Sequence, residues 1–149
     1  MKILVVESNP ILLKIIAIKL QHQNYLVYSS IDGEHVRQLI TQIKPDVIIT
    51  KLRLKYISGF ELIRFAKHEL PNAYVIVITK INQETILQDL LKTGANVCIK
   101  RPFDIEQLIN YISEFKFKKT APITELQLSK TIPIYKQPIQ LYKDATNKS

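Results

Sequence analysis

Five charged or hydroxyl side chains stand at, or just after, the ends of apolar segments, where α/β proteins commonly place their chemistry. They are Glu7, Ser8, Lys51, Thr79 and Arg101. A carboxylate at such a position can accept a phosphoryl group or hold a cation, whereas a lysine that is protonated near neutral pH can do neither. Lys51 therefore predicts that carboxylate chemistry is absent at this strand end.

Two alternating patterns in residues 1–115 indicate the elements that must position these side chains. Short apolar runs predict strands over 3–6, 25–29, 47–50, 74–79 and 97–99. The segments that follow them predict helices over 11–21, 32–43, 60–69, 84–92 and 104–115. Five strand–helix units in succession predict an α/β fold with a doubly wound, five-stranded parallel sheet. We expect the strand order 2-1-3-4-5, which brings the ends of strands 1, 3 and 4 to one cleft.

Local signals mark several of these helix ends. Ser8-Asn9-Pro10 supplies N-cap chemistry and a proline for the first turn of a helix, and Asp104 supplies a cap for the last helix. Gly94 follows a helical segment, as expected of a C-terminal cap. The sequence therefore predicts where three of the helices begin or end.

The composition is that of a globular chain of one domain. It has 149 residues, of which 46% are hydrophobic, and no stretch approaches the roughly 18 apolar residues that cross a bilayer. Glu7 interrupts the apolar start, so we interpret the first segment as a strand rather than a signal peptide. The single cysteine, Cys98, excludes an internal disulfide and suits a reducing compartment. We expect a cytoplasmic protein that makes no membrane contact.

The positive charge is concentrated near the C-terminus. The net charge is +8; residues 1–115 hold 14 Lys/Arg against 11 Asp/Glu, and residues 116–149 hold 7 against 2. We expect 1–115 to form the domain and 116–149 to form a basic, proline-containing tail that is extended or disordered. A basic tail either binds phosphate-rich partners or only keeps the segment soluble. This tail lacks the cluster of arginines expected of a helix that binds in a groove of DNA.

Motifs at all five strand ends resemble one family. Val5-Val6-Glu7-Ser8, Pro45-Asp46-Val47-Ile48-Ile49-Thr50-Lys51, Ser58-Gly59, Val77-Ile78-Thr79, Gly94-Ala95 and Arg101-Pro102-Phe103 follow in order. Together they resemble the receiver domain of two-component response regulators, over about residues 1–115. The resemblance implies a flavodoxin-like fold and a role in phosphorelay signal transduction. The tail resembles nothing that we can name.

The resemblance also gives the cleft residues their expected roles. A working receiver holds Mg²⁺ with two adjacent acids after strand 1 and an aspartate after strand 3, and that aspartate becomes phosphorylated. Here Glu7-Ser8 and Lys51 occupy those positions, so we predict an atypical receiver that lacks the phosphoacceptor aspartate and is not an enzyme. We expect no metal and no other cofactor, because one carboxylate beside cations makes a poor Mg²⁺ site. Thr79 matches the family's phosphoryl-sensing hydroxyl and Arg101 its phosphate-contacting lysine.

Lys51 admits two interpretations. The simpler is that its side chain points to solvent at a decayed site. The alternative is that it reaches Glu7, replaces a cation bridge and holds one conformation. Cys98 stands where many receivers carry a switch aromatic, and we expect it to be a small packing residue.

Function is then expected on a surface. The resemblance implies a dimerisation and partner face built from helix 4, strand 5 and helix 5, on which we place Ile86, Leu87, Leu90, Ile99, Tyr111 and Phe115. The first hypothesis is a receiver-like module that signals by phosphorylation-independent protein contact, with a protein partner or a second copy. The second is a nucleic-acid-associated transcriptional regulator that uses the basic tail. The third is a residual phosphoacceptor at Ser8 or Thr50.

Overall fold

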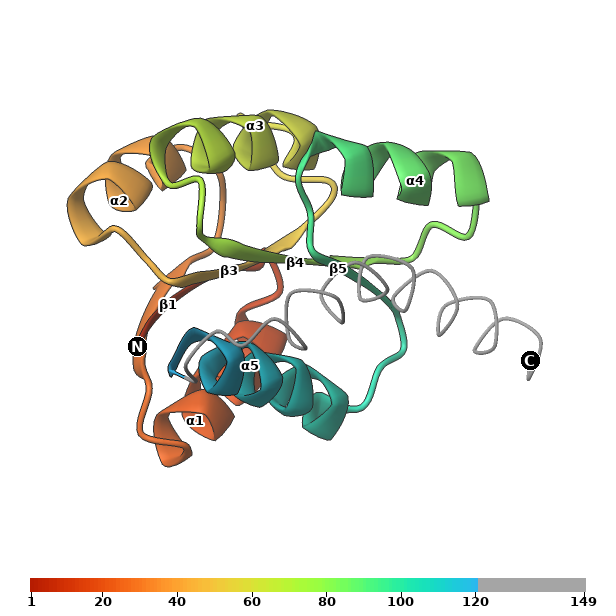
Figure 1. The fold of residues 1–149 in the computed structure, drawn as a ribbon. Coiled ribbons are helices and arrows are strands. Elements are labelled where there is room, and N and C mark those ends of the chain that lie inside the picture. The colour runs from red at the N-terminus through yellow and green to blue at the C-terminus, as the bar shows by residue number, and fades with distance from the viewer. Residues whose placement is uncertain (121–149) are drawn as a thin grey trace, which may run out of the picture.

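The computed structural model of the chain describes residues 1–120. They form a parallel five-stranded sheet in the order β2-β1-β3-β4-β5, with one helix after each strand (Figure 1). This confirms the predicted α/β class and the doubly wound strand order. The elements are β1 (Lys2–Val6), α1 (Pro10–His22), β2 (Leu26–Ser30), α2 (Val36–Ile43), β3 (Val47–Lys51), α3 (Gly59–Glu69), β4 (Tyr74–Thr79), α4 (Glu84–Thr93), β5 (Val97–Lys100) and α5 (Ile105–Thr120).

The sheet has a hydrophobic layer on each side. Helices α1 and α5 cover one face, and α2, α3 and α4 cover the other (Figure 1). Successive side chains of a strand point to opposite faces, so Leu4 and Val6 pack in the α2–α4 layer while Ile3 and Val5 pack in the α1–α5 layer. Because strands buried on both faces need apolar residues at every position, the inner strands are continuous apolar runs.

The predicted caps are confirmed. The Asn9 side chain accepts hydrogen bonds from the backbone N–H groups of Ile11 and Leu12, at 3.0 and 3.2 Å, and Pro10 occupies the first position of α1. Gly94 ends α4 with φ +133°, a conformation that side-chain-bearing residues rarely adopt. The Asp104 carboxylate accepts from the Glu106 N–H at 3.0 Å at the start of α5.

Two helix boundaries differ from the sequence-based prediction by more than one residue. Helix α2 begins at Val36 rather than near Asp32, because the Gly33 N–H donates to the Lys55 carbonyl at 3.0 Å and so belongs to a loop contact. Helix α5 runs to Thr120, five residues beyond Phe115.

The last turns of α5 are held from two sides. The Phe115 ring stacks on Tyr74 with centroids 4.6 Å apart, and the Lys119 ammonium pairs with Asp46. Residues 116–120 of the predicted tail are therefore helical, and residues 121–149 lie outside the described part of the chain. Among residues 1–120, no helix combines the length and the apolar character needed to span a membrane.

Candidate functional site

Glu7 is a buried carboxylate at the carboxyl end of β1. Only 2% of its side chain is exposed. The Arg101 guanidinium donates to Oε2, while the Lys51 ammonium lies 3.8 Å from Oε1 and the Asn9 N–H donates to Oε1 at 3.0 Å. Both carboxylate oxygens are therefore engaged by the protein itself. This arrangement offsets the cost of burying a charge, which is high when no partner is present.

Lys51 lies inside the site. Its ammonium donates to the Ser8 hydroxyl at 2.7 Å and lies within ion-pair distance of Glu7, and 25% of its side chain is exposed. The simpler interpretation from the sequence, that Lys51 points to solvent, is therefore wrong. Ser8 itself is exposed and takes part in the site through this hydrogen bond.

Thr79 and Arg101 are joined through the backbone. The Arg101 N–H donates to the Thr79 carbonyl at 2.9 Å, just beyond the pairing of β4 with β5, and the Arg101–Pro102 peptide bond is cis. The buried Thr79 hydroxyl accepts a hydrogen bond from the Ile81 N–H at 3.0 Å. The end of β4 is thus tied both to the turn before α5 and to the segment that leads into α4.

These residues surround a cleft of about 490 Å³ at the carboxyl edge of the sheet. Four of the five predicted site residues line it: Glu7, Lys51, Thr79 and Arg101. The prediction missed two cationic members, Arg53 and Lys80. The signal was present in the sequence, since Lys80 directly follows β4 and Arg53 stands two residues after β3. An antiparallel bridge between Arg53 and Ser58 closes the loop that carries Arg53.

The cleft does not fit Mg²⁺. Mg²⁺ requires near-octahedral oxygen ligands, and carboxylates usually supply the protein's share. Here one carboxylate is present, both its oxygens are occupied, and two cations adjoin it. Within residues 1–120, no three His, Cys, Asp or Glu side chains are grouped to hold a metal ion. No chemical step through a bound metal ion follows from this arrangement.

Cys98 is a buried residue of the core on the α2–α4 side of the sheet. Burial raises the pKa of its thiol to about 12. Because the thiolate is the reactive form, a thiol with this pKa is inert at neutral pH. The packing role predicted for Cys98 is consistent with this position.

The predicted interaction face is largely core. Leu87, Leu90 and Ile99 are buried, with 3% or less of each exposed. Ile86 is partly buried and packs on the same core as Leu87. The other two members, Tyr111 and Phe115, are partly buried against the α1–α5 layer. These side chains cannot supply an apolar docking patch, because the sheet and its helices already cover most of their surface.

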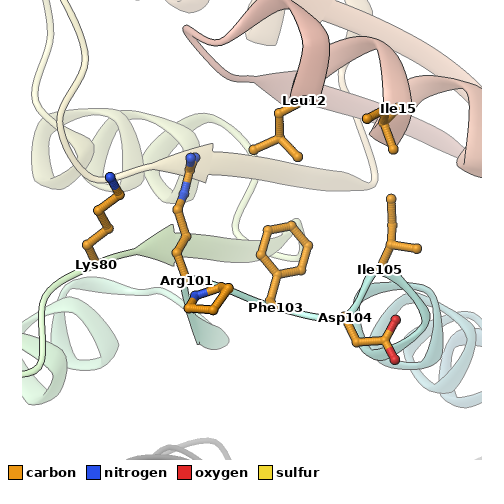
Figure 2. A pocket seen from close by; sticks show the side chains of 8 residues that line it. Leu12, Ile15, Lys80, Arg101, Phe103, Asp104 and Ile105 are labelled. Atoms are coloured by element: carbon orange, nitrogen blue, oxygen red, sulfur yellow. The ribbon is translucent and has the colours of Figure 1, made fainter.

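Three exposed apolar side chains lie together on α1. Ile11, Ile15 and Ile18 are 72%, 46% and 42% exposed, and their spacing of four and three residues places them on one side of the helix. Beside them is an apolar groove of about 800 Å³, in which Leu12 and Ile15 face residues of the turn before α5 (Figure 2). The groove is lined by Leu12, Ile15, Lys80, Arg101, Pro102, Phe103, Asp104 and Ile105.

Residues 3–113 match the family model of the response regulator receiver domain. Among curated proteins, the chain is 32% identical over 108 residues to the response regulator ArlR of Staphylococcus saprophyticus, covering 72% of this chain and 49% of ArlR. It is 26% identical over 113 residues to the DNA-binding dual master transcriptional regulator RpaA of Synechocystis, covering 72% and 46%. The chain thus spans about half the length of these two relatives.

Solved structures show the same fold. The BeF3-activated receiver domain of DrrB is 28% identical to this chain and superimposes with a TM-score of 0.70. The alignment covers 76% of this chain and 95% of that domain. The receiver domain of the Francisella response regulator 1452 superimposes with a TM-score of 0.73, and the alignment covers 80% of this chain and 98% of that domain. At 23% identity, this similarity shows the fold alone.

Proposed function

This chain belongs to the family of response regulator receiver domains, and from that premise we propose that it signals by protein contact without phosphorylation at the end of β3. Members of this family act in two-component signal transduction, which implies protein partners. We place this activity in the cytoplasm, in keeping with the single cysteine and its buried thiol.

One observation carries the proposal: Lys51 and Arg101 hold Glu7 between them at the position where the family resemblance places acids and Mg²⁺. A carboxylate nucleophile is needed to form an aspartyl phosphate, and an ammonium group offers none. In phosphoryl transfer a metal ion neutralises the charge of the incoming phosphoryl group. Here Lys51 and Arg101 pair with Glu7, the carboxylate that would otherwise be a ligand of that ion. The lack of a carboxylate at the end of β3 and of a free carboxylate for Mg²⁺ supports the proposal that the chain is a pseudo-receiver.

The contact surface that we propose is the exposed side of α1 together with the groove beside it. The α1 sequence holds two lysines, Lys14 and Lys19, and no acid, and the groove is lined by Lys80 and Arg101 against one acid, Asp104. Two α1 helices facing each other would bring like charges together. Charge complementarity therefore favours an amphipathic partner helix that carries apolar and acidic side chains over a second copy of this chain.

Intact mass, measured under denaturing conditions after incubation with Mg²⁺ and a small-molecule phosphodonor, tests the absence of phosphorylation. We expect no change for the natural chain and a gain of one phosphoryl group for a Ser8→Asp/Lys51→Asp double variant, in which the carboxylates are restored. A phosphoryl group on the natural chain would contradict the proposal. The modified residue, such as Ser8 or Thr50, would then identify the acceptor.

A further inference from the structure

The cleft at the carboxyl edge of the sheet carries a strong excess of positive charge. Four cationic side chains line it, Lys51, Arg53, Lys80 and Arg101, against the single carboxylate of Glu7, which leaves a net formal charge of +3. This excess is not a property of the whole domain, because residues 1–115 carry a net charge of +3 in all. The charge of the domain outside the cleft therefore sums to about zero.

Two of the four cationic side chains interact with other residues of the cleft, and two form no ion pair in the described part of the chain. Arg101 and Lys51 engage Glu7 and Ser8. Within residues 1–120, neither Arg53 nor Lys80 forms an ion pair, and both are exposed at the mouth of the cleft. Neutralising Glu7 therefore does not use up the positive potential of the site.

These cations converge from different strand ends. Arg53 follows β3, Lys80 follows β4 and Arg101 follows β5, and parallel strands bring those ends to one edge. Figure 2 shows Lys80 and Arg101 side by side, with their terminal nitrogens directed to the same side. The cleft of about 490 Å³ is large enough for a small ligand. Like charges gathered in a concave site focus the potential on an incoming anion.

The polar groups of the cleft are mainly donors. Lysine and arginine side chains donate only, and the Thr79 hydroxyl, which already accepts from the Ile81 N–H, has its own proton to give. A ligand that matches this set presents several acceptor oxygens and negative charge. A tetrahedral phosphate group does so, and arginine forks and lysine ammonium groups bind it well.

We infer that this cleft binds a phosphate-type oxyanion, free phosphate or a small phosphate monoester, non-covalently and without a divalent metal ion. The inference goes beyond the proposed function, because it gives the cleft a ligand of its own and involves no phosphoryl transfer. Arg53 and Lys80 supply positive charge that no carboxylate of residues 1–120 neutralises, and Arg101 and Lys51 line the rest of the binding site. The domain then senses an anion where its relatives perform chemistry.

Calorimetric titration of the full chain with inorganic phosphate and with glycerol phosphate, in EDTA and low salt, tests this inference. We expect saturable binding that tightens as pH rises through the second pKa of the phosphate and weakens as chloride is added. Tighter binding of inorganic phosphate would identify free phosphate as the ligand, and tighter binding of glycerol phosphate would identify a monoester. Both results support the inference.

Variants at the two exposed cations of the cleft test whether phosphate binds there. Arg53→Met and Lys80→Met are each expected to weaken binding about tenfold, which corresponds to about 1.4 kcal/mol. Arg64→Met, at an exposed position of α3 outside the cleft, is the matched control and is expected to bind normally. The inference is overturned if phosphate shows no saturable binding, or if the Arg53→Met/Lys80→Met double variant binds as the natural chain does. Because the proposed function is tested by covalent mass, the two can fail separately.

Discussion

At the scale of single residues, the central feature is the buried carboxylate of Glu7, which interacts more closely with one of its two cationic partners than with the other. The Arg101 guanidinium is hydrogen-bonded to Glu7, whereas the Lys51 ammonium is 3.8 Å from it and gives its hydrogen bond to Ser8. Removing one partner of a buried pair costs mainly the desolvation of the charge left behind. Arg101 is therefore the partner on which the burial of Glu7 depends more strongly.

We predict that Arg101→Ala lowers the free energy of unfolding by about 3 kcal/mol, and Lys51→Ala by about 1 kcal/mol. The first value reflects an uncompensated buried charge, and the second reflects a longer, partly solvated pair. Urea denaturation measures both. Arg64→Ala, at an exposed position that pairs with nothing in residues 1–120, is the control and is expected to change little.

Adding Glu7→Gln to the Arg101→Ala variant is expected to recover much of the loss, because the buried charge is then absent. The double-mutant cycle isolates this coupling. Equal losses for Arg101→Ala and Lys51→Ala, with no recovery by Glu7→Gln, would contradict the unequal pairing described above.

At the scale of elements, the ends of helices depend on contacts made across the sheet. The Asp46 carboxylate, just before β3, accepts from the Lys2 N–H at 2.9 Å and pairs with Lys119 in the last turn of α5. Burial raises the pKa of Asp46, but the hydrogen bonds from Lys119 and Lys2, together with the positive charges of Lys119 and the N-terminus, hold that pKa below its usual value. The last turn of α5 is thus tied to the start of two strands.

We predict that this tie weakens in acid. A carboxyl whose pKa is lowered on folding stabilises the fold above the ordinary pKa of aspartate, about 3.9, and the stabilisation is lost as pH falls through the folded value. Half of the Lys119 side chain is solvated, so the contribution is at most about 1 kcal/mol.

Urea denaturation of the natural chain and of Asp46→Asn, at pH 6 and at lower pH, measures this contribution. The stability difference between the two proteins is expected to shrink as the pH is lowered below about 3.9, towards the lower pKa of Asp46 in the folded protein. A difference that stays constant across this range would show that the Asp46 charge contributes nothing to the end of α5.

At the scale of the whole molecule, two surfaces with different chemistry meet at the turn before α5. Lys80 and Arg101 line both the charged cleft and the apolar groove beside α1. Ile15, one of the exposed isoleucines of α1, lines this groove together with Lys80 and Arg101 (Figure 2). An anion bound in the cleft would reduce the positive charge that a partner meets at the groove, because the same two side chains serve both sites.

We predict that the chain binds a synthetic helical peptide with an apolar stripe flanked by glutamates, and that the same peptide with lysines does not bind. Fluorescence anisotropy of a labelled peptide measures this. Ile11→Asp and Ile15→Asp are each expected to weaken binding at least about tenfold, because each places a charge in the apolar contact. Ile31→Asp, at a position that is 59% exposed outside the groove, is the matched control.

Sedimentation of the natural chain supplies the competing outcome. A dimer that Ile15→Asp abolishes would identify a second copy of this chain as the occupant of the groove. Equal binding of the glutamate and lysine peptides would remove the charge argument for an acidic partner.

The sequence by itself determined the architecture. Apolar runs alternating with helical patterns, punctuated by Asn9-Pro10, Gly94 and Asp104, were enough to predict five strand–helix units and their order. The handedness of the crossovers then placed Glu7, Lys51, Thr79 and Arg101 at one edge. These are consequences of local periodicity and chain chirality, which a sequence displays directly.

Only the tertiary structure decided how the side chains are used. Glu7 and Arg101 are 94 residues apart, so no local pattern could indicate that Arg101 is the hydrogen-bonded partner and that Lys51 turns to Ser8. Burial is likewise a property of the packed layers. Leu87, Leu90 and Ile99 are covered by neighbours from distant segments, while the equally apolar Ile11 stays exposed because nothing in residues 1–120 covers that side of α1.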